Sequence, residues 1–164
     1  MRKSKKIKLG NIFIGGDSKV TVQSMLNAPA HVIEGNVRQA LELQQAGCEI
    51  IRVAVPDEQA VKTVAALKNA LTVPVVADIH FNHKLALMSI DAGVDKVRIN
   101  PGNIGDDEKV KAVVKACSAK NIPIRIGVNA GSLEKNILAK YGNTSSNLIT
   151  ILQKAQDIYG YLPK

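Results

Sequence analysis

The stretch KVRINPGNIG, Lys96–Gly105, has the pattern of a buried strand that runs into a turn. Within it, Arg98 and Asn100 alternate with Val97 and Ile99. A fully buried parallel strand is normally a continuous run of Val, Ile and Leu, and an unpaired charge inside a protein is costly. The stretch therefore predicts an anionic partner for the Arg98 guanidinium.

The same alternation recurs on the neighbouring segments of strand pattern. Because strand side chains alternate between two faces, each segment has an apolar face and a polar face. The apolar faces carry Ile51, Val53 and Val55, then Val75, Ala77 and Ile79, then Ile124, Ile126 and Val128, and the first segment carries Val20 and Val22. The polar faces carry Arg52, then Asp78 and His80, then Arg125, Gly127 and Asn129, and the first segment carries Thr21 and Gln23. The polar residues lie near the carboxyl ends of the segments, where a (β/α)8 barrel has its active site.

Strand and helix patterns alternate along the whole chain after a short segment, 7–16, that is compatible with a hairpin. The expected strands are 20–25, 49–56, 73–80, 96–100 and 122–129. The expected helices are 36–47, 57–71 with Asp57 as N-cap, 84–93, 106–120, 133–141 and 146–159. Such alternation predicts a parallel sheet with right-handed crossovers. We expect an α/β fold, a partial TIM-type barrel of about five strand-helix units.

A doubly wound sheet is the alternative to the barrel. It would require two apolar faces on each strand, and no G-x-G-x-x-G follows the first strand. The barrel is therefore favoured. The expected domains are a basic tail with a short hairpin at 1–16 and an incomplete barrel at 17–164.

Charge and hydropathy exclude several classes of protein. The net charge is +8, but five of the 22 basic residues lie in the first eight positions, which leaves 17 basic against 14 acidic residues. With no Trp and 3% aromatic residues, little material for base stacking remains, so we expect no nucleic-acid partner. No apolar run approaches the roughly 20 residues that cross a membrane, and the basic start lacks the apolar region of a signal peptide. We expect a cytoplasmic chain without a membrane partner.

The three strand arginines, Arg52, Arg98 and Arg125, are expected to converge at the barrel mouth. Like charges repel, so a cluster of guanidinium groups requires a multivalent anion, and guanidinium groups suit phosphate. The turns 101–105 and 129–132, the second ending at Ser132, would add backbone N–H donors. The plainer alternative is a structural ion pair, with Asp78 neutralising Arg52 or Arg98.

Five motifs at these positions resemble, in the same order, one enzyme family. They are VTVQSM, RVAVP, VADIHF, VRINPGNIG and NIPIRIGVNAGSLEK. Together they resemble the N-terminal barrel of the 4-hydroxy-3-methylbut-2-enyl diphosphate synthases, the reductive enzymes of the non-mevalonate isoprenoid pathway. The resemblance covers almost the whole chain.

The resemblance implies methylerythritol cyclodiphosphate as the substrate and a two-electron reductive ring opening with loss of water. It implies a pocket lined by Arg52, Asp78, His80, Arg98, Asn100, Arg125 and Asn129, to which we add Ser132 of the following turn. It also implies flavodoxin or ferredoxin as electron donor and a four-iron four-sulfur cluster. Because the family is dimeric, we expect a homo-oligomer. The family binds that cluster through three cysteines and a glutamate in a separate C-terminal domain.

The chain departs from this pattern in places. Its five strand-helix units leave out the last barrel strands, a substrate-binding lysine and the cluster domain. Leu26, Ala28 and Val32 stand where the family usually has Thr, Thr and Asp, and FNHK at 81–84 replaces F-D-x-R. Cys48 and Cys117 lack C-x-x-C spacing, so we expect buried thiols, no metal site and no cluster ligand in this chain.

Two other functions remain open on the sequence. One is a pterin-binding transferase of the dihydropteroate synthase type, which also places Asp, Asn and Arg at a barrel mouth. The other is a non-catalytic barrel remnant. No residue is assigned a catalytic role.

Overall fold

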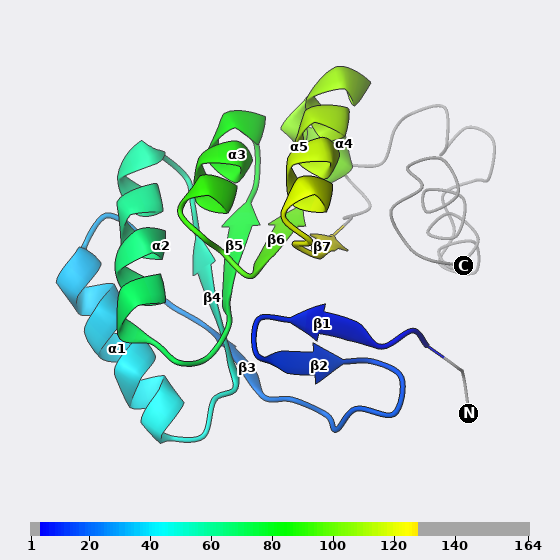
Figure 1. Cartoon of the computed structure of the whole chain (residues 1–164). Helices are drawn as coiled ribbons and strands as arrows, with labels where there is room; N and C mark the ends of the chain where they lie inside the picture. Colours follow the sequence, from blue (N-terminus) through cyan, green and yellow to red (C-terminus); the bar gives the residue numbers. More distant parts are fainter. Residues whose placement is uncertain (1–3, 128–164) are drawn as a thin grey trace, which may run out of the picture.

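The computed structural model describes residues 4–127, and its centre is a five-stranded parallel sheet (Figure 1). The strands are β3 (Gln23–Met25), β4 (Ile50–Ala54), β5 (Val75–Ile79), β6 (Lys96–Ile99) and β7 (Ile124–Ile126). Each strand pairs with the next one in the chain, in the order β3-β4-β5-β6-β7. A doubly wound sheet would reverse its order at a switch point. The sequential order is that of a (β/α)8 barrel, and within the described residues the barrel is not closed.

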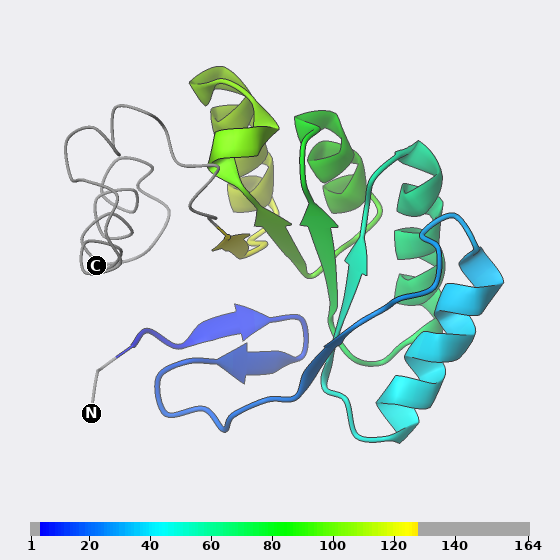
Figure 2. The same ribbon diagram turned by 180° about the vertical axis from the view of Figure 1, so that it is seen from behind.

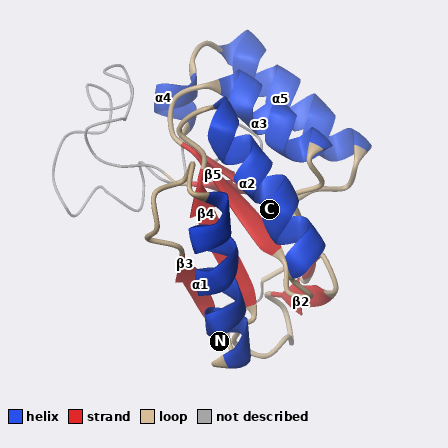
Figure 3. Cartoon of the chain, turned by 90° about the vertical axis from the view of Figure 1, so that its left-hand side faces the viewer, coloured by secondary structure: helices blue, strands red, loops and turns tan. Residues whose placement is uncertain are grey.

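The helices that connect the strands all cover one face of the sheet, as Figure 3 shows. They are α1 (Ile33–Gln45), α2 (Glu58–Ala70), α3 (His83–Asp91), the short α4 (Pro101–Ile104) and α5 (Asp107–Ala119). Helices α2, α3 and α5 each begin with a side-chain oxygen that accepts a hydrogen bond from a backbone N–H of the first turn. The residues are Asp57, Asn82 and Asp106. Such N-caps satisfy donors that have no partner within the helix.

The core lies between the helices and the outer face of the sheet. Ile51, Val53, Ala77, Val97 and Ile99 point into it and are buried. Cys48 and Cys117 are buried among the same residues, as expected. The sheet thus buries an apolar outer face under the helices. Its inner face is not covered by these helices and can carry polar side chains.

The hairpin of β1 (Ile7–Leu9) and β2 (Ile12–Ile14) lies at the amino ends of the parallel strands, which Figure 2 shows from behind. Gly10 has a φ of 55° at the first position of the two-residue turn, a conformation that glycine adopts without strain. Leu9 packs on the inner face against Ile50 and Val76. The hairpin therefore closes the bottom of the barrel interior and leaves the mouth at the opposite end.

Two expected strands require correction, and one helix was not expected. The first strand covers Gln23–Met25 and not 20–25, and Val20 and Val22 are 96% and 60% exposed, so neither packs under a helix. Helix α4 was not predicted. The predicted strand 122–129 spans Ile124–Ile126 and leads into residues outside the described part.

The helices predicted at 133–141 and 146–159 also lie outside the described residues. Within residues 4–127, no helix combines the length and the apolar character that crossing a bilayer requires.

Candidate functional site

The candidate site lies on the inner face of β4, β5 and β6. Strand pairing places Asp78 directly beside Arg98 on one side and Ala54 on the other, while Arg98 lies beside Arg125 of β7. One row nearer the amino ends of the strands, Arg52 lies beside Val76. The alternation expected from the sequence thus gathers the charged residues of separate strands on one face.

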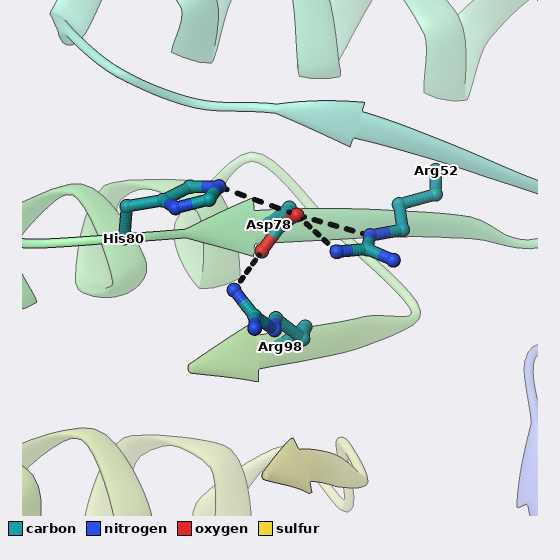
Figure 4. Close-up of polar contacts among 4 residues, drawn as sticks. All are labelled: Arg52, Asp78, His80 and Arg98. Atoms are coloured by element: carbon teal, nitrogen blue, oxygen red, sulfur yellow. Dashed lines mark hydrogen bonds and ion pairs between the residues drawn. The ribbon is translucent and has the colours of Figure 1, made fainter. Parts of the chain in front are cut away.

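Asp78 is the centre of this cluster, and its side chain is fully buried (Figure 4). Its Oδ2 accepts a hydrogen bond from Arg52 Nε at 3.0 Å and a second one from Arg52 Nη2. Its Oδ1 accepts a hydrogen bond from Arg98 Nη1 at 3.0 Å. One carboxylate therefore holds two guanidinium groups from two strands, which lowers their mutual repulsion and fixes their positions.

His80 lies beyond Asp78 on the same strand path, with Nε2 3.4 Å from Asp78 Oδ2. Its side chain is about half exposed, at 47%. Arg125 is exposed on β7 and lies next to Arg98, but it is not among the partners of Asp78 in the described structure. The expected convergence of three arginines is thus an Asp78-bound pair with the third arginine one strand further along.

Asn100 is almost fully buried at the end of β6, where its Oδ1 accepts the Gly102 N–H at 3.2 Å. The N–H groups of Asn103 and Ile104 bond to the Asn100 carbonyl. The turn was expected to offer backbone donors to an anion, but it satisfies these three itself because it winds into α4. Asn129 and Ser132 lie outside the described residues.

Gly127 allows Arg98 to lie where it does. A Cβ atom added at Gly127 would lie 2.8 Å from Arg98 Cζ and closer still to two of the guanidinium nitrogens. Real Cβ atoms essentially never approach other atoms so closely. A side chain at this position would push the guanidinium away from Asp78.

Lys96 is the site residue that the sequence reasoning missed. It shares the inner face with Arg98, lies beside Val76 in the strand register, and is only 5% exposed. The signal was in the opening stretch, where Lys96, Arg98 and Asn100 are spaced two apart.

The residues of this chain do not fit an iron-sulfur cluster. Such clusters require several thiolates, and the chain has two cysteines. Cys48 donates its thiol to the Ile50 carbonyl, and burial raises the pKa of the Cys117 thiol to about 11, which opposes thiolate formation. Among the described residues, no group of three His, Cys, Asp or Glu side chains could hold a metal ion.

Comparison with known families decides the family of the chain. The model described as the GcpE TIM-barrel domain matches residues 4–160. The chain belongs to the GcpE TIM-barrel family. This match covers every strand and helix described above, and it agrees with the sequential strand order.

Curated relatives of this GcpE barrel chain carry the name 4-hydroxy-3-methylbut-2-en-1-yl diphosphate synthase (flavodoxin). The protein from Exiguobacterium sibiricum is 57% identical over 140 residues, which cover 85% of this chain and 38% of the relative. The protein from Clostridium perfringens is 51% identical over 148 residues, which cover 90% of this chain and 42% of the relative. The chain thus spans about two fifths of the length of these relatives.

Solved structures similar to the GcpE barrel chain include dihydropteroate synthases. The enzyme from Yersinia pestis gives a TM-score of 0.68 at 15% identity, covering 94% of this chain and 61% of that one. The enzyme from Thermus thermophilus gives 0.62 at 15% identity, covering 98% of this chain and 62% of that one. At this identity the likeness shows the barrel fold alone, so it adds no support to the pterin alternative.

The departures in the first loop of the GcpE barrel chain have distinct structural settings. Leu26 is buried in the core, where a threonine hydroxyl would need a partner. Val32 occupies the N-cap of α1 and makes no capping hydrogen bond through its side chain. Val32 therefore leaves α1 without a side-chain cap, whereas Leu26 keeps the core apolar.

Proposed function

We propose that this chain is the substrate-binding barrel of a 4-hydroxy-3-methylbut-2-en-1-yl diphosphate synthase, an oxidoreductase of the non-mevalonate isoprenoid pathway. In this proposal it binds methylerythritol cyclodiphosphate. The observation that carries the proposal is the Arg52–Asp78–Arg98 cluster at the barrel mouth, in a chain whose curated relatives carry that enzyme name. The pterin alternative lacks a comparable observation.

The cluster suits a diphosphate because most of its donors remain unused by Asp78. A guanidinium group has five N–H donors, of which Arg52 gives two and Arg98 one to the carboxylate. The remaining N–H groups can donate hydrogen bonds to phosphate oxygens. Arg125 lies next to Arg98 and can supply further N–H donors. Two cations share one acid, so the pair keeps a net positive charge that an anion would neutralise.

The proposed chemistry is the opening of the cyclic diphosphate by two electrons and two protons, with loss of one water. Flavodoxin, named for the relatives, or ferredoxin would supply the electrons. The described residues do not fit the iron-sulfur cluster of the family, so we assign them substrate binding and no redox step. We further propose that the active enzyme is cytoplasmic and homo-oligomeric, with Asn129 and Ser132 completing the pocket.

Isothermal titration with the cyclic diphosphate tests the proposal. The variant Arg98→Ala should bind at least about tenfold more weakly than the unmutated chain, because it loses charge-assisted bonds to phosphate. The matched control is Arg38→Ala, which removes an exposed arginine from α1 and should leave affinity unchanged. Circular dichroism should show that both variants fold. Equal affinity in Arg98→Ala and the unmutated chain, or no binding by either, would contradict the proposal.

A further inference from the structure

Lys96 is a buried cation at the floor of the candidate site. It begins β6 and lies beside Val76, which lies in turn beside Arg52, so one inner row reads Arg52, Val76, Lys96 across three strands. The row above contains Asp78 and Arg98. Lys96 therefore lies one row below Arg98 on the same strand, and in the same row as Arg52 two strands away. These are the two arginines that the proposed function assigns to the diphosphate.

No acid in the described structure neutralises this lysine. Both oxygens of Asp78, the acid of the row above, bond to arginines. Asp95, the neighbour of Lys96 in the chain, accepts Lys68 Nζ at 2.5 Å and the Val75 N–H at 2.8 Å. From below, the hairpin contributes the apolar Leu9 to this face.

The charged groups near Lys96 are therefore mostly of its own sign. Burial, followed by the charges of Arg125 and Arg52, lowers the pKa of the Lys96 ammonium below its ordinary value. A buried cation without an acid is costly, and groups kept at such a cost cluster at functional sites.

We propose that Lys96 is a further anion-binding residue of this site, which contacts the bound diphosphate from below as a protonated ammonium group. This inference rests on the proposed function, since it assigns a new residue to the same ligand. An anion beside Lys96 favours its charged form, so ligand binding and protonation of Lys96 assist each other. The proton is taken up from solvent.

The proposal predicts a specific pH dependence. The cyclic diphosphate has one ionised oxygen on each phosphorus and keeps the same charge across neutral and alkaline pH. Because burial and then the charges of Arg125 and Arg52 lower the pKa of Lys96, its ammonium group loses its proton in the free chain at a lower pH than an exposed lysine does. The affinity of the unmutated chain should therefore fall as pH rises, by up to tenfold per pH unit. The variant Lys96→Met, which removes the charge and keeps an unbranched side chain only one atom shorter, should bind about tenfold more weakly at pH 7 and show no such fall.

Isothermal titration from pH 7 to 10, in pairs of buffers with different ionisation enthalpies, measures both affinity and proton uptake. The first control is Lys115→Met, which removes the same charge from the exposed face of α5 and should behave like the unmutated chain. The second is Lys96→Arg, which keeps a cation that does not titrate in this range. It should retain most of the affinity at pH 7 and lose the pH dependence.

The outcomes separate this inference from the proposed function. If the unmutated chain binds the cyclic diphosphate and Lys96→Met binds it equally well with the same pH profile, the role of Lys96 is refuted and the proposed function stands. If the unmutated chain does not bind, both are refuted. A Lys96→Met chain that fails to fold leaves Lys96→Arg as the test, because an unchanged pH profile in that variant also refutes the role.

Discussion

Replacement of Asp78 by asparagine tests the centre of the cluster. Asp78→Asn keeps the shape of the side chain but removes the charge that holds Arg52 and Arg98. One amide oxygen cannot accept all three N–H donors, and the amide NH2 would face a guanidinium group. Two partly buried guanidinium groups would then lie side by side without a counter-charge.

The expected loss follows from the burial of the three partners. Breaking a buried ion pair by removing one partner costs about 3 to 5 kcal/mol. The side chain of Asp78 is fully buried, but those of Arg52 and Arg98 are 21% and 12% exposed, so water can solvate part of each freed charge. We therefore expect the lower end, a decrease of about 3 kcal/mol in the free energy of unfolding.

Urea denaturation followed by circular dichroism at pH 7 measures this loss. The matched control is Asp57→Asn at the N-cap of α2, where the side chain accepts the Ala60 N–H at 2.9 Å. Asparagine caps helices about as well as aspartate, so this change should stay within about 0.5 kcal/mol. A loss below about 1 kcal/mol in Asp78→Asn, the range of exposed ion pairs, would refute the view that Asp78 holds the cluster together.

Two further predictions concern residues beside the site. Gly127→Ala should displace the Arg98 guanidinium and weaken binding of the cyclic diphosphate by about tenfold, but it should have no further effect in an Arg98→Ala background. Additive losses in titrations of the double variant would show that the two residues act separately. Val32→Asp should supply the missing N-cap of α1 and raise the free energy of unfolding by about 1 kcal/mol in urea titrations. Val20→Asp, at an exposed valine outside any helix, is its control, and an equal gain there would contradict the capping explanation.

Sequence pattern predicted the strands that are buried on their outer face. In β4, β5 and β6 the apolar residues of one face pack under helices. Period-two alternation therefore predicts that Arg52, Asp78 and Arg98 lie together on the opposite face, as they do. The pattern failed at Val20 and Val22, whose side chains are exposed although valine is typical of strands. Alternation identifies a face, but whether a helix covers that face depends on packing between distant segments.

The details of bonding could not be predicted from the sequence. The ion pair between Asp78 and the arginines was an open alternative to phosphate binding, and the structure shows that the pair exists. The backbone N–H groups of the turn after β6 were expected to bind an anion. In α4 they donate instead to oxygens of Asn100. The close approach of Gly127 to Arg98 depends on the register of β6 and β7, which short-range patterns do not specify.

The presence of the ion pair does not by itself decide between a structural role and an anion site, but the balance of charge favours the anion site. A structural pair would be satisfied by one arginine for one carboxylate. Here a single buried acid faces Arg52, Arg98 and the buried Lys96, and it bonds only to the arginines. The apolar outer face and the hairpin form the core of the fold, whereas Lys96 adds no ion pair to it among the described residues. An excess of positive charge is costly in the free chain and becomes favourable when an anion binds, as expected of a surface that recognises phosphate groups.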